Sequence, residues 1–148
     1  MSLSIAKVGL IGGIDMDMTQ ALFWLTLTIY HEARGESVAG QKAVAKVILH
    51  RAKKNGWPVS NVVLSRKQFS CFNEGLDHPS VWIRNVVTAA KVLENAEAGL
   101  KEWLAGDTLY GATHYFALLG MPNHQPPYWV KGMKFIVEIK GHRFYREG

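Results

Sequence analysis

The amino-acid sequence predicts a mainly helical α+β domain with a small β-hairpin. Three segments carry apolar residues at three- and four-residue spacing, which is typical of helices with one buried face. Short apolar strands stand out only near the C-terminus. With 148 residues, of which 48% are hydrophobic, the chain can form one sizeable core but not two. We therefore expect a single domain over residues 1–148 and allow for loose order in residues 1–15.

The first helix is predicted from the apolar run at residues 22–30. Asp17 or Thr19 can cap its start, and Gly35 suits a left-handed position just after its end. Glu32 then lies in the last turn of the helix.

Glu32 is a candidate general acid. The free carbonyl groups at a helix C-terminus disfavour a carboxylate, and apolar neighbours such as Tyr30 or Trp24 would exclude water from it. Both effects raise the pKa of its carboxyl group, whereas an approaching Arg34 would lower it. A carboxyl group that keeps its proton near neutral pH can protonate the leaving oxygen of a glycosidic bond. The alternative is an ordinary exposed residue at a helix end.

The middle of the chain predicts two further long helices and a short one. In chain order we expect a helix from Ser37 to about Lys54, a break at residues 55–58, a short helix over residues 61–64 after Ser60, a loop over residues 68–79, and a helix from Pro79 to about Ala98 that stops at Gly99. Near the C-terminus, strands at residues 135–139 and 142–145 flank Lys140-Gly141, which is typical of a two-residue hairpin turn.

The net charge of +5 and the isoelectric point near 9.4 favour an anionic partner. Nucleic acid, anionic lipid and an acidic cell-wall polymer all qualify. The basic residues are scattered and match no nucleic-acid-binding motif, so we expect no nucleic-acid partner. The apolar run at residues 21–30 is too short to cross a bilayer, and we expect no stable membrane insertion.

The single cysteine and the six histidines do not indicate a metal site or a disulfide. Cys71 has no second cysteine to pair with, and we expect it to be a small buried apolar residue. No HExxH motif or cysteine pair accompanies the histidines, for which packing or hydrogen bonding is the simpler role. We predict neither a metal nor a cofactor.

Six ordered sequence blocks carry a resemblance to a known family. They are Glu32-Ala-Arg-Gly-Glu36, Gly40-Gln-Lys-Ala-Val-Ala45, Gln68-Phe-Ser70, Gly111-Ala-Thr-His-Tyr115, Pro127-Tyr-Trp129 and Gly141-His-Arg-Phe-Tyr145. Together they resemble the SleB-like cell-wall hydrolase family (hydrolase 2), which includes spore-cortex-lytic enzymes and phage endolysins. The resemblance covers nearly the whole chain after Trp24 and implies a lysozyme-like, lytic-transglycosylase-type fold that acts on peptidoglycan.

The resemblance implies a reaction for Glu32. As general acid and then base, Glu32 would cleave the β-1,4 bond between N-acetylmuramic acid and N-acetylglucosamine and leave a 1,6-anhydromuramyl end. A hydrolytic muramidase of the same fold is the first alternative, with Glu36 as a possible second carboxylate. A non-catalytic wall-binding module is the second.

Two departures from the family pattern have different meanings. The second helix ends in His50-Arg51 where the family usually has Asn-Arg, a change that we expect to alter only hydrogen bonding at the helix end. The separate wall-binding domain of germination enzymes is absent from this sequence, which favours a stand-alone catalytic module of the endolysin type. We expect a monomer that acts on glycan strands in the bacterial cell wall or periplasm. No signal peptide is evident, so export would need another route.

Candidate substrate-binding residues follow from the same blocks. They are Glu36, Gln68, Phe69, Ser70, Thr113, His114, Tyr115 and Trp129. Small polar groups suit hydroxyl and acetamide recognition, and aromatic faces suit sugar rings. Phe69 and Trp129 could instead belong to the core, Gln68 and Thr113 could satisfy turns, and Glu36 could stabilise the start of the second helix.

Overall fold

The computed structural model describes residues 7–11, 14–65 and 69–148. The helices are α1 (Met18–Ala33), α2 (Val38–Asn55), α3 (Val59–Val63) and α4 (Val86–Leu104), and the strands are β1 (Lys7–Ile11), β2 (Ile14–Asp17), β3 (His114–Ala117), β4 (Met133–Ile139) and β5 (His142–Glu147). Short 3₁₀ turns lie at Ser70–Phe72, Pro79–Val81, Leu109–Gly111, Leu118–Gly120, Pro122–His124 and Tyr128–Val130. The predicted class, mainly helical with a small antiparallel β element, is confirmed.

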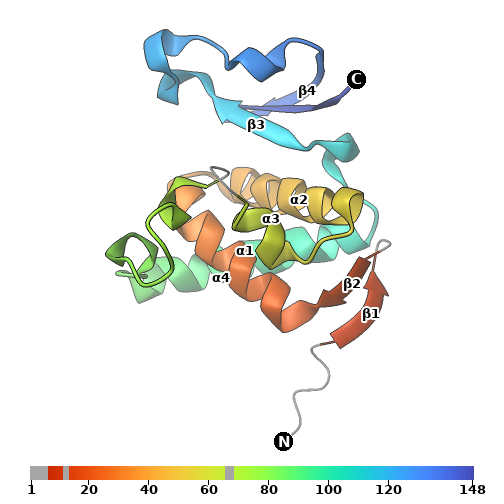
Figure 1. The fold of residues 1–148 in the computed structure, drawn as a ribbon, viewed down its shortest axis with the longest axis vertical. Helices are drawn as coiled ribbons and strands as arrows, with labels where there is room; N and C mark the ends of the chain where they lie inside the picture. Colours follow the sequence, from red (N-terminus) through yellow and green to blue (C-terminus); the bar gives the residue numbers. More distant parts are fainter. Residues whose placement is uncertain (1–6, 12–13, 66–68) are drawn as a thin grey trace, which may run out of the picture.

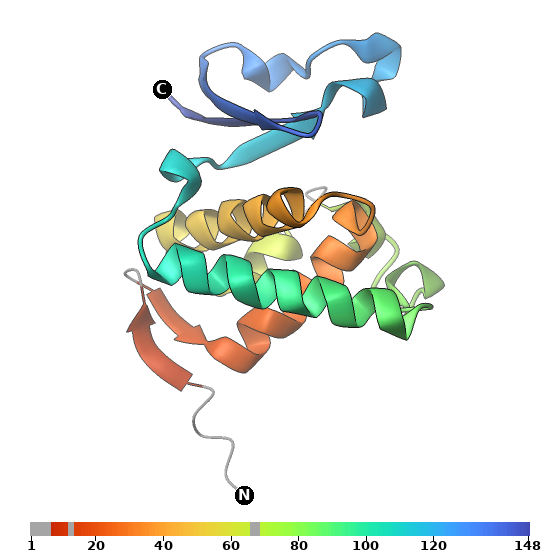
Figure 2. The ribbon, with the colours of Figure 1, turned by 180° about the vertical axis from the view of Figure 1, so that it is seen from behind.

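The helices form one body, and the three-stranded sheet lies against it along α2 (Figure 1). The strand order is β3-β5-β4, and both pairings are antiparallel. The β1–β2 hairpin contacts α1 at the far end of the helical body, away from the sheet (Figure 2). Strand β1 and the start of β2 therefore lie within residues 1–15, for which the sequence allowed loose order.

Helix α2 is buried on two faces. Its stripe of Val44, Ala45, Ile48, Leu49 and Ala52 belongs to the helical core, which α1, α3 and α4 complete. Its opposite face carries Ala43 and Val47, which form a second cluster with Ala112 and Phe144. Phe144, in the middle of β5, is 0% exposed. This second cluster joins the sheet to the helices.

Helix boundaries agree with the sequence where a capping side chain marks them. Asp17 caps α1 by accepting from the backbone N–H of Gln20, and Ser37 caps α2 by accepting from that of Gly40. Gly56 ends α2 in the left-handed conformation. Gly35 was expected to do the same for α1, but its φ is not positive, and α1 ends through Arg34 in the right-handed helical region.

The start and the end of the last long helix, α4, were predicted wrongly. Pro79 opens only a 3₁₀ turn, and α4 begins seven residues later, where the Asn85 side chain accepts from the backbone N–H of Thr88. Val86 and Val87 are exposed, while the buried face is Val92, Ala96, Gly99, Leu100 and Trp103. The short helix also starts earlier than expected, at Val59 after Pro58.

Gly99 lies inside α4 rather than after it, because α2 and α4 approach closely there. A Cβ at Gly99 would lie 3.0 Å from Ala45 Cβ and 3.2 Å from the Lys42 carbonyl oxygen. Gly99→Ala is therefore expected to lower the free energy of unfolding by about 1 kcal/mol, since overpacking of about 1–3 kcal/mol outweighs alanine's helix propensity of about 1 kcal/mol. Urea denaturation measures this. Lys91→Ala on the exposed side of α4 is the control, and a stabilised Gly99→Ala would contradict the close packing.

The C-terminal hairpin is confirmed in detail. Lys140 and Gly141 both have positive φ, 49° and 86°, which is the geometry of the two-residue turn that best matches strand twist. The sheet gains a third strand, β3, that the sequence did not predict. Tyr115 of β3 pairs with Phe144 of β5, so the buried side of the sheet is built from both strands.

Candidate active site

Glu32 lies in the last turn of α1 with its side chain half-buried. Its Oε1 is 3.5 Å from the backbone nitrogen of Cys71, which donates to it in a long hydrogen bond. Burial, and then the Glu32 carboxylate, raise the pKa of the Cys71 thiol to about 12. That thiol is therefore uncharged at neutral pH, as expected of a buried cysteine, and it lies close to the Glu32 carboxylate.

Tyr115 lies on the sheet within electrostatic range of Glu32. Burial, and then the negative charge of Glu32, raise the pKa of the Tyr115 hydroxyl. The Tyr115 ring stacks on Phe144, with ring centroids 5.6 Å apart. Because Glu32 comes from α1 and Tyr115 from β3, the carboxylate lies at the junction between the helical body and the sheet.

Glu36 joins the turn after α1 to β5. Its Oε2 lies 3.2 Å from Nδ1 of His142, an ion-pair distance if the imidazole is protonated. The buried amide of Gln41 fixes this turn by donating to the carbonyl oxygens of Arg34, at 3.2 Å, and Glu36, at 3.3 Å. Gln41 in turn accepts from the Asn95 side chain at 2.9 Å. The backbone that separates the two glutamates is therefore held by α2 and α4.

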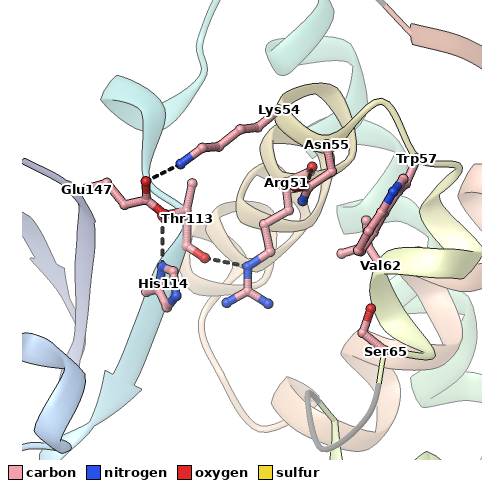
Figure 3. Close-up of a pocket in the computed structure, with 9 residues that line it drawn as sticks. All are labelled: Arg51, Lys54, Asn55, Trp57, Val62, Ser65, Thr113, His114 and Glu147. Atoms are coloured by element: carbon pink, nitrogen blue, oxygen red, sulfur yellow. Dashed lines mark hydrogen bonds and ion pairs between the residues drawn. The ribbon is translucent and has the colours of Figure 1, made fainter.

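A pocket of about 290 Å³ opens between the end of α2, α3 and the sheet (Figure 3). Its lining residues are Arg51, Lys54, Asn55, Trp57, Val62, Ser65, Thr113, His114 and Glu147. Arg51 Nε donates to the Thr113 carbonyl oxygen at 2.5 Å, and this contact ties α2 to the segment before β3. Lys54 and Glu147 form an ion pair at 2.5 Å beside it. Two predicted substrate-binding residues, Thr113 and His114, thus share a pocket.

His114 is held in its neutral form. Burial, and then the positive charge of Arg51, lower the pKa of its imidazole, while Glu147 opposes them. Its Nδ1 lies 2.8 Å from Oγ1 of Thr113. The ring packs on Trp129, with centroids 5.1 Å apart. Trp129 is therefore part of an aromatic group on the sheet and is half-buried.

The three residues predicted from the Gln68-Phe-Ser70 block differ in burial and in whether the structure describes them. Phe69 is 5% exposed and packs in the helical core, so its backbone positions the next residue while its ring is covered. Ser70 is exposed and begins the 3₁₀ turn that also contains the buried Cys71. Gln68 lies outside the described residues.

Three residues of this region were not predicted as functional: Gln41, Arg51 and His142. Gln41 and His142 stand inside the sequence blocks that carried the resemblance, and that was their only signal. Arg51 adjoins the place where the chain departs from the family pattern. The Thr113 carbonyl oxygen that it contacts lies 62 residues later in the chain, so only the fold reveals this contact.

Searches for two other kinds of site gave no candidates. Among residues 7–11, 14–65 and 69–148, no group of three or more His, Cys, Asp or Glu side chains could hold a metal ion. Within the same ranges, no helix has the length and apolar character required to cross a bilayer.

The helical body and the small antiparallel sheet packed on it form a lysozyme-like fold. Residues 35–145 match the model of the cell wall hydrolase family, and the chain belongs to that family. The expected membership is confirmed. The matched region begins three residues after Glu32.

Two solved structures share the fold. One is the catalytic domain of the germination-specific lytic transglycosylase SleB from Bacillus anthracis, 25% identical, with a TM-score of 0.61 over 86% of this chain and 94% of that one. The other is the catalytic domain of the Bacillus cereus SleB protein, also 25% identical, with a TM-score of 0.62 over 86% of this chain and 91% of that one. None of the curated proteins matches the sequence.

Proposed function

We propose that this cell wall hydrolase is a lytic transglycosylase that cleaves the β-1,4 bond between N-acetylmuramic acid and N-acetylglucosamine in peptidoglycan. The observation that carries the proposal is the position of Glu32, half-buried between Cys71 and Tyr115 where the helices meet the sheet. The likeness to the Bacillus anthracis transglycosylase domain supports the same reaction class. The endolysin-type role stays a prediction from the sequence.

In this mechanism Glu32 donates one proton and then accepts another. Its carboxyl group first protonates the bridging oxygen as the bond from that oxygen to C1 of the muramic residue breaks. The acetamido group of the substrate stabilises the positive charge that develops at C1. The Glu32 carboxylate then accepts the proton of the muramic 6-hydroxyl while O6 bonds to C1. The enzyme is regenerated, a 1,6-anhydro end forms, and no water is consumed.

Hydrolysis is the second candidate, and one observation favours it. Glu36 also acts on Tyr115 through its charge, so a second carboxylate lies in the same region as Glu32. An inverting or retaining glycosidase needs such a pair. In the transglycosylase reaction, Glu36 would instead bind substrate together with His142, 3.2 Å away.

Mass spectrometry of the muropeptides released from purified sacculi distinguishes transglycosylation from hydrolysis. We expect anhydromuramyl ends, which are lighter than reducing ends by one water. Glu36→Gln is expected to keep forming anhydro ends at a reduced rate, because Glu36 transfers no proton in this mechanism. Release of reducing ends alone, together with loss of activity in Glu36→Gln, would contradict the transglycosylase reaction and show that the enzyme is a muramidase.

A further inference from the structure

A different pocket, of about 300 Å³, opens where the end of α1 meets the segment that leads into α4. Its lining includes two arginines, Arg34 and Arg84, and two histidines, His31 and His78, but no Asp or Glu. Asp77 precedes His78 in the chain, but it is exposed and does not line the pocket. The lining therefore carries an excess of positive charge, which suits an anionic ligand.

The two arginines of this pocket lie on aromatic rings. The Cζ atom of Arg34 is 5.2 Å from the centroid of the Tyr30 ring, and its Nη1 donates to the Tyr30 carbonyl oxygen at 3.0 Å. The Cζ atom of Arg84 is 5.6 Å from the centroid of the Trp82 ring. Among the described residues, neither guanidinium group forms an ion pair with an Asp or Glu side chain. An aromatic face orients a guanidinium group but does not neutralise it, so both arginines can bind an anion.

The Tyr30 hydroxyl group is a third donor at this pocket. Tyr30 lines the pocket and is only 4% exposed. Its hydroxyl oxygen accepts from the backbone N–H groups of Arg84 and Asn85, both at 3.1 Å. Within the described part of the chain, the hydroxyl proton itself is donated to no acceptor. A buried donor without an acceptor costs free energy, and an oxygen atom of a bound ligand would supply the missing acceptor.

The His78 ring is a fourth donor. Its Nδ1 accepts from the backbone N–H of Ser80 at 3.1 Å, so Nε2 carries a proton in both the neutral and the charged ring. The donors thus come from three segments, namely α1, the residue that caps the 3₁₀ turn at Pro79–Val81, and the extended residues before α4. Donors on separate segments suit the tetrahedral oxygens of a phosphate group better than the two coplanar oxygens of a carboxylate.

Short contacts connect this pocket to Glu32. The Ser80 hydroxyl group, which lines the pocket, donates to the Cys71 carbonyl oxygen at 2.8 Å. The backbone N–H of Cys71 donates to the Glu32 carboxylate. Arg34 follows Glu32 by two residues at the same end of α1. A polymer bound in the pocket would therefore lie close to the proposed site of cleavage.

We propose that this pocket binds a phosphate group of an anionic wall polymer, a polyol phosphate chain attached to the glycan, with Arg34 and Arg84 as the binding residues. A volume of about 300 Å³ is at the small end for ligand pockets and suits one phosphate group with part of its polyol. Trp82, 53% exposed, offers an apolar surface to the carbon chain. The inference goes beyond the proposed function, because it requires an enzyme that works in the cell wall but no particular reaction at Glu32.

The test compares two soluble polymers that differ in their acidic group, poly(glycerol phosphate) and poly(glutamate) of similar length. Calorimetry gives the Kd for each. The wild type is expected to bind the phosphate polymer at least about tenfold more tightly than the carboxylate polymer. Arg84→Gln is expected to raise the Kd for poly(glycerol phosphate) by about tenfold to hundredfold, the range for a lost hydrogen bond to a charged group. Arg84→Lys should restore part of this loss, because lysine keeps the charge but not the paired donors.

Lys53→Gln is the matched charge control, because Lys53 is exposed near the end of α2 and does not line this pocket. It should change the Kd by less than about twofold, the size of a general electrostatic effect from one surface charge. Arg34→Gln is the second test variant and should weaken binding as Arg84→Gln does. Equal affinity of the wild type for the two polymers, or equal losses in Lys53→Gln and Arg84→Gln, would overturn the proposal and indicate only a general attraction to the basic surface.

Cleavage assays separate this inference from the proposed function. On sacculi from which hydrofluoric acid has removed the phosphate-linked polymers, Arg84→Gln should cleave at the wild-type rate, because the pocket has no ligand there. On untreated sacculi its rate should fall by about threefold or more. Equal rates of Arg84→Gln and the wild type on both preparations would overturn the proposal. Glu32→Gln should keep the wild-type Kd for poly(glycerol phosphate), so this Kd would still decide the inference if Glu32 proved not to be the acid.

Discussion

Glu32→Gln is expected to reduce the rate of wall cleavage by about a hundredfold to ten-thousandfold. The substitution keeps the size of the side chain and its ability to accept from the backbone N–H of Cys71, but it removes the transferable proton. Loss of turbidity from purified sacculi measures the rate. Thermal melting should be nearly unchanged, since the contacts of the side chain are retained.

Glu94→Gln provides the matched control for this prediction. Glu94 is exposed on α4, so the same chemical change there should leave the rate as it is. Equal clearing of the suspension by Glu32→Gln and the wild type would show that another group supplies the proton. Glu36 would then be the next candidate for the proton donor, and the products released by Glu36→Gln would test it.

Phe144→Ala is expected to lower the free energy of unfolding by about 3–5 kcal/mol, the usual cost of deleting a fully buried aromatic side chain. Phe144 is 0% exposed and fills the space between β5 and α2. Such a loss is a large fraction of the stability of a typical domain, about 5–15 kcal/mol. Denaturant unfolding followed by circular dichroism gives the value. Cleavage activity should fall as well, because Tyr115 stacks on this ring.

Phe135→Ala is the matched control for Phe144→Ala, because it removes the same type of side chain from an exposed position. Phe135 lies on the neighbouring strand β4 but is 51% exposed, so its loss should cost less than about 1 kcal/mol. A similar cost for the two substitutions would mean that the cluster between β5 and α2 does not hold the sheet in place.

The parts of the fold that were predictable are those set by local signals. The helix cap at Ser37, the left-handed glycine after α2 and the turn at Lys140-Gly141 each use a residue whose backbone preference decides the outcome. The helix over α2 was also predicted, but its apolar residues do not form a single stripe. Ala43 and Val47 lie on the face opposite the helical core and pack in the second cluster.

The failures arise where contacts distant in sequence override local signals. Glycine is a residue type that often ends a helix, yet Gly99 lies inside α4 and allows α2 and α4 to pack closely. Pro79 suits a first helical turn, but the chain stays extended from Trp82 to Asn85, where the Tyr30 hydroxyl accepts from the backbone N–H groups of Arg84 and Asn85. Strand β3 exists because β5 pairs with it, a partner some thirty residues away.

Some residues of the candidate site could also be predicted from local signals, and others only from the fold. The end of an apolar helix was enough to single out Glu32, and adjacency in one block brought Thr113, His114 and Tyr115 together. Arg51 could not be found like this, because α2 alone does not reveal which side of the helix meets the sheet. The covered ring of Phe69 likewise depends on how four helices pack.

The two-sided burial of α2 has a consequence for how the enzyme works. Its inner stripe supports α1, which carries Glu32, while its outer face supports the sheet, which carries Tyr115. Helix α1 and the sheet are thus packed on opposite faces of the same helix, α2. Close packing leaves them little freedom to move relative to each other. The relative position of Glu32 and Tyr115 is therefore set when the chain folds, and a substrate that reached both side chains would find them already in place.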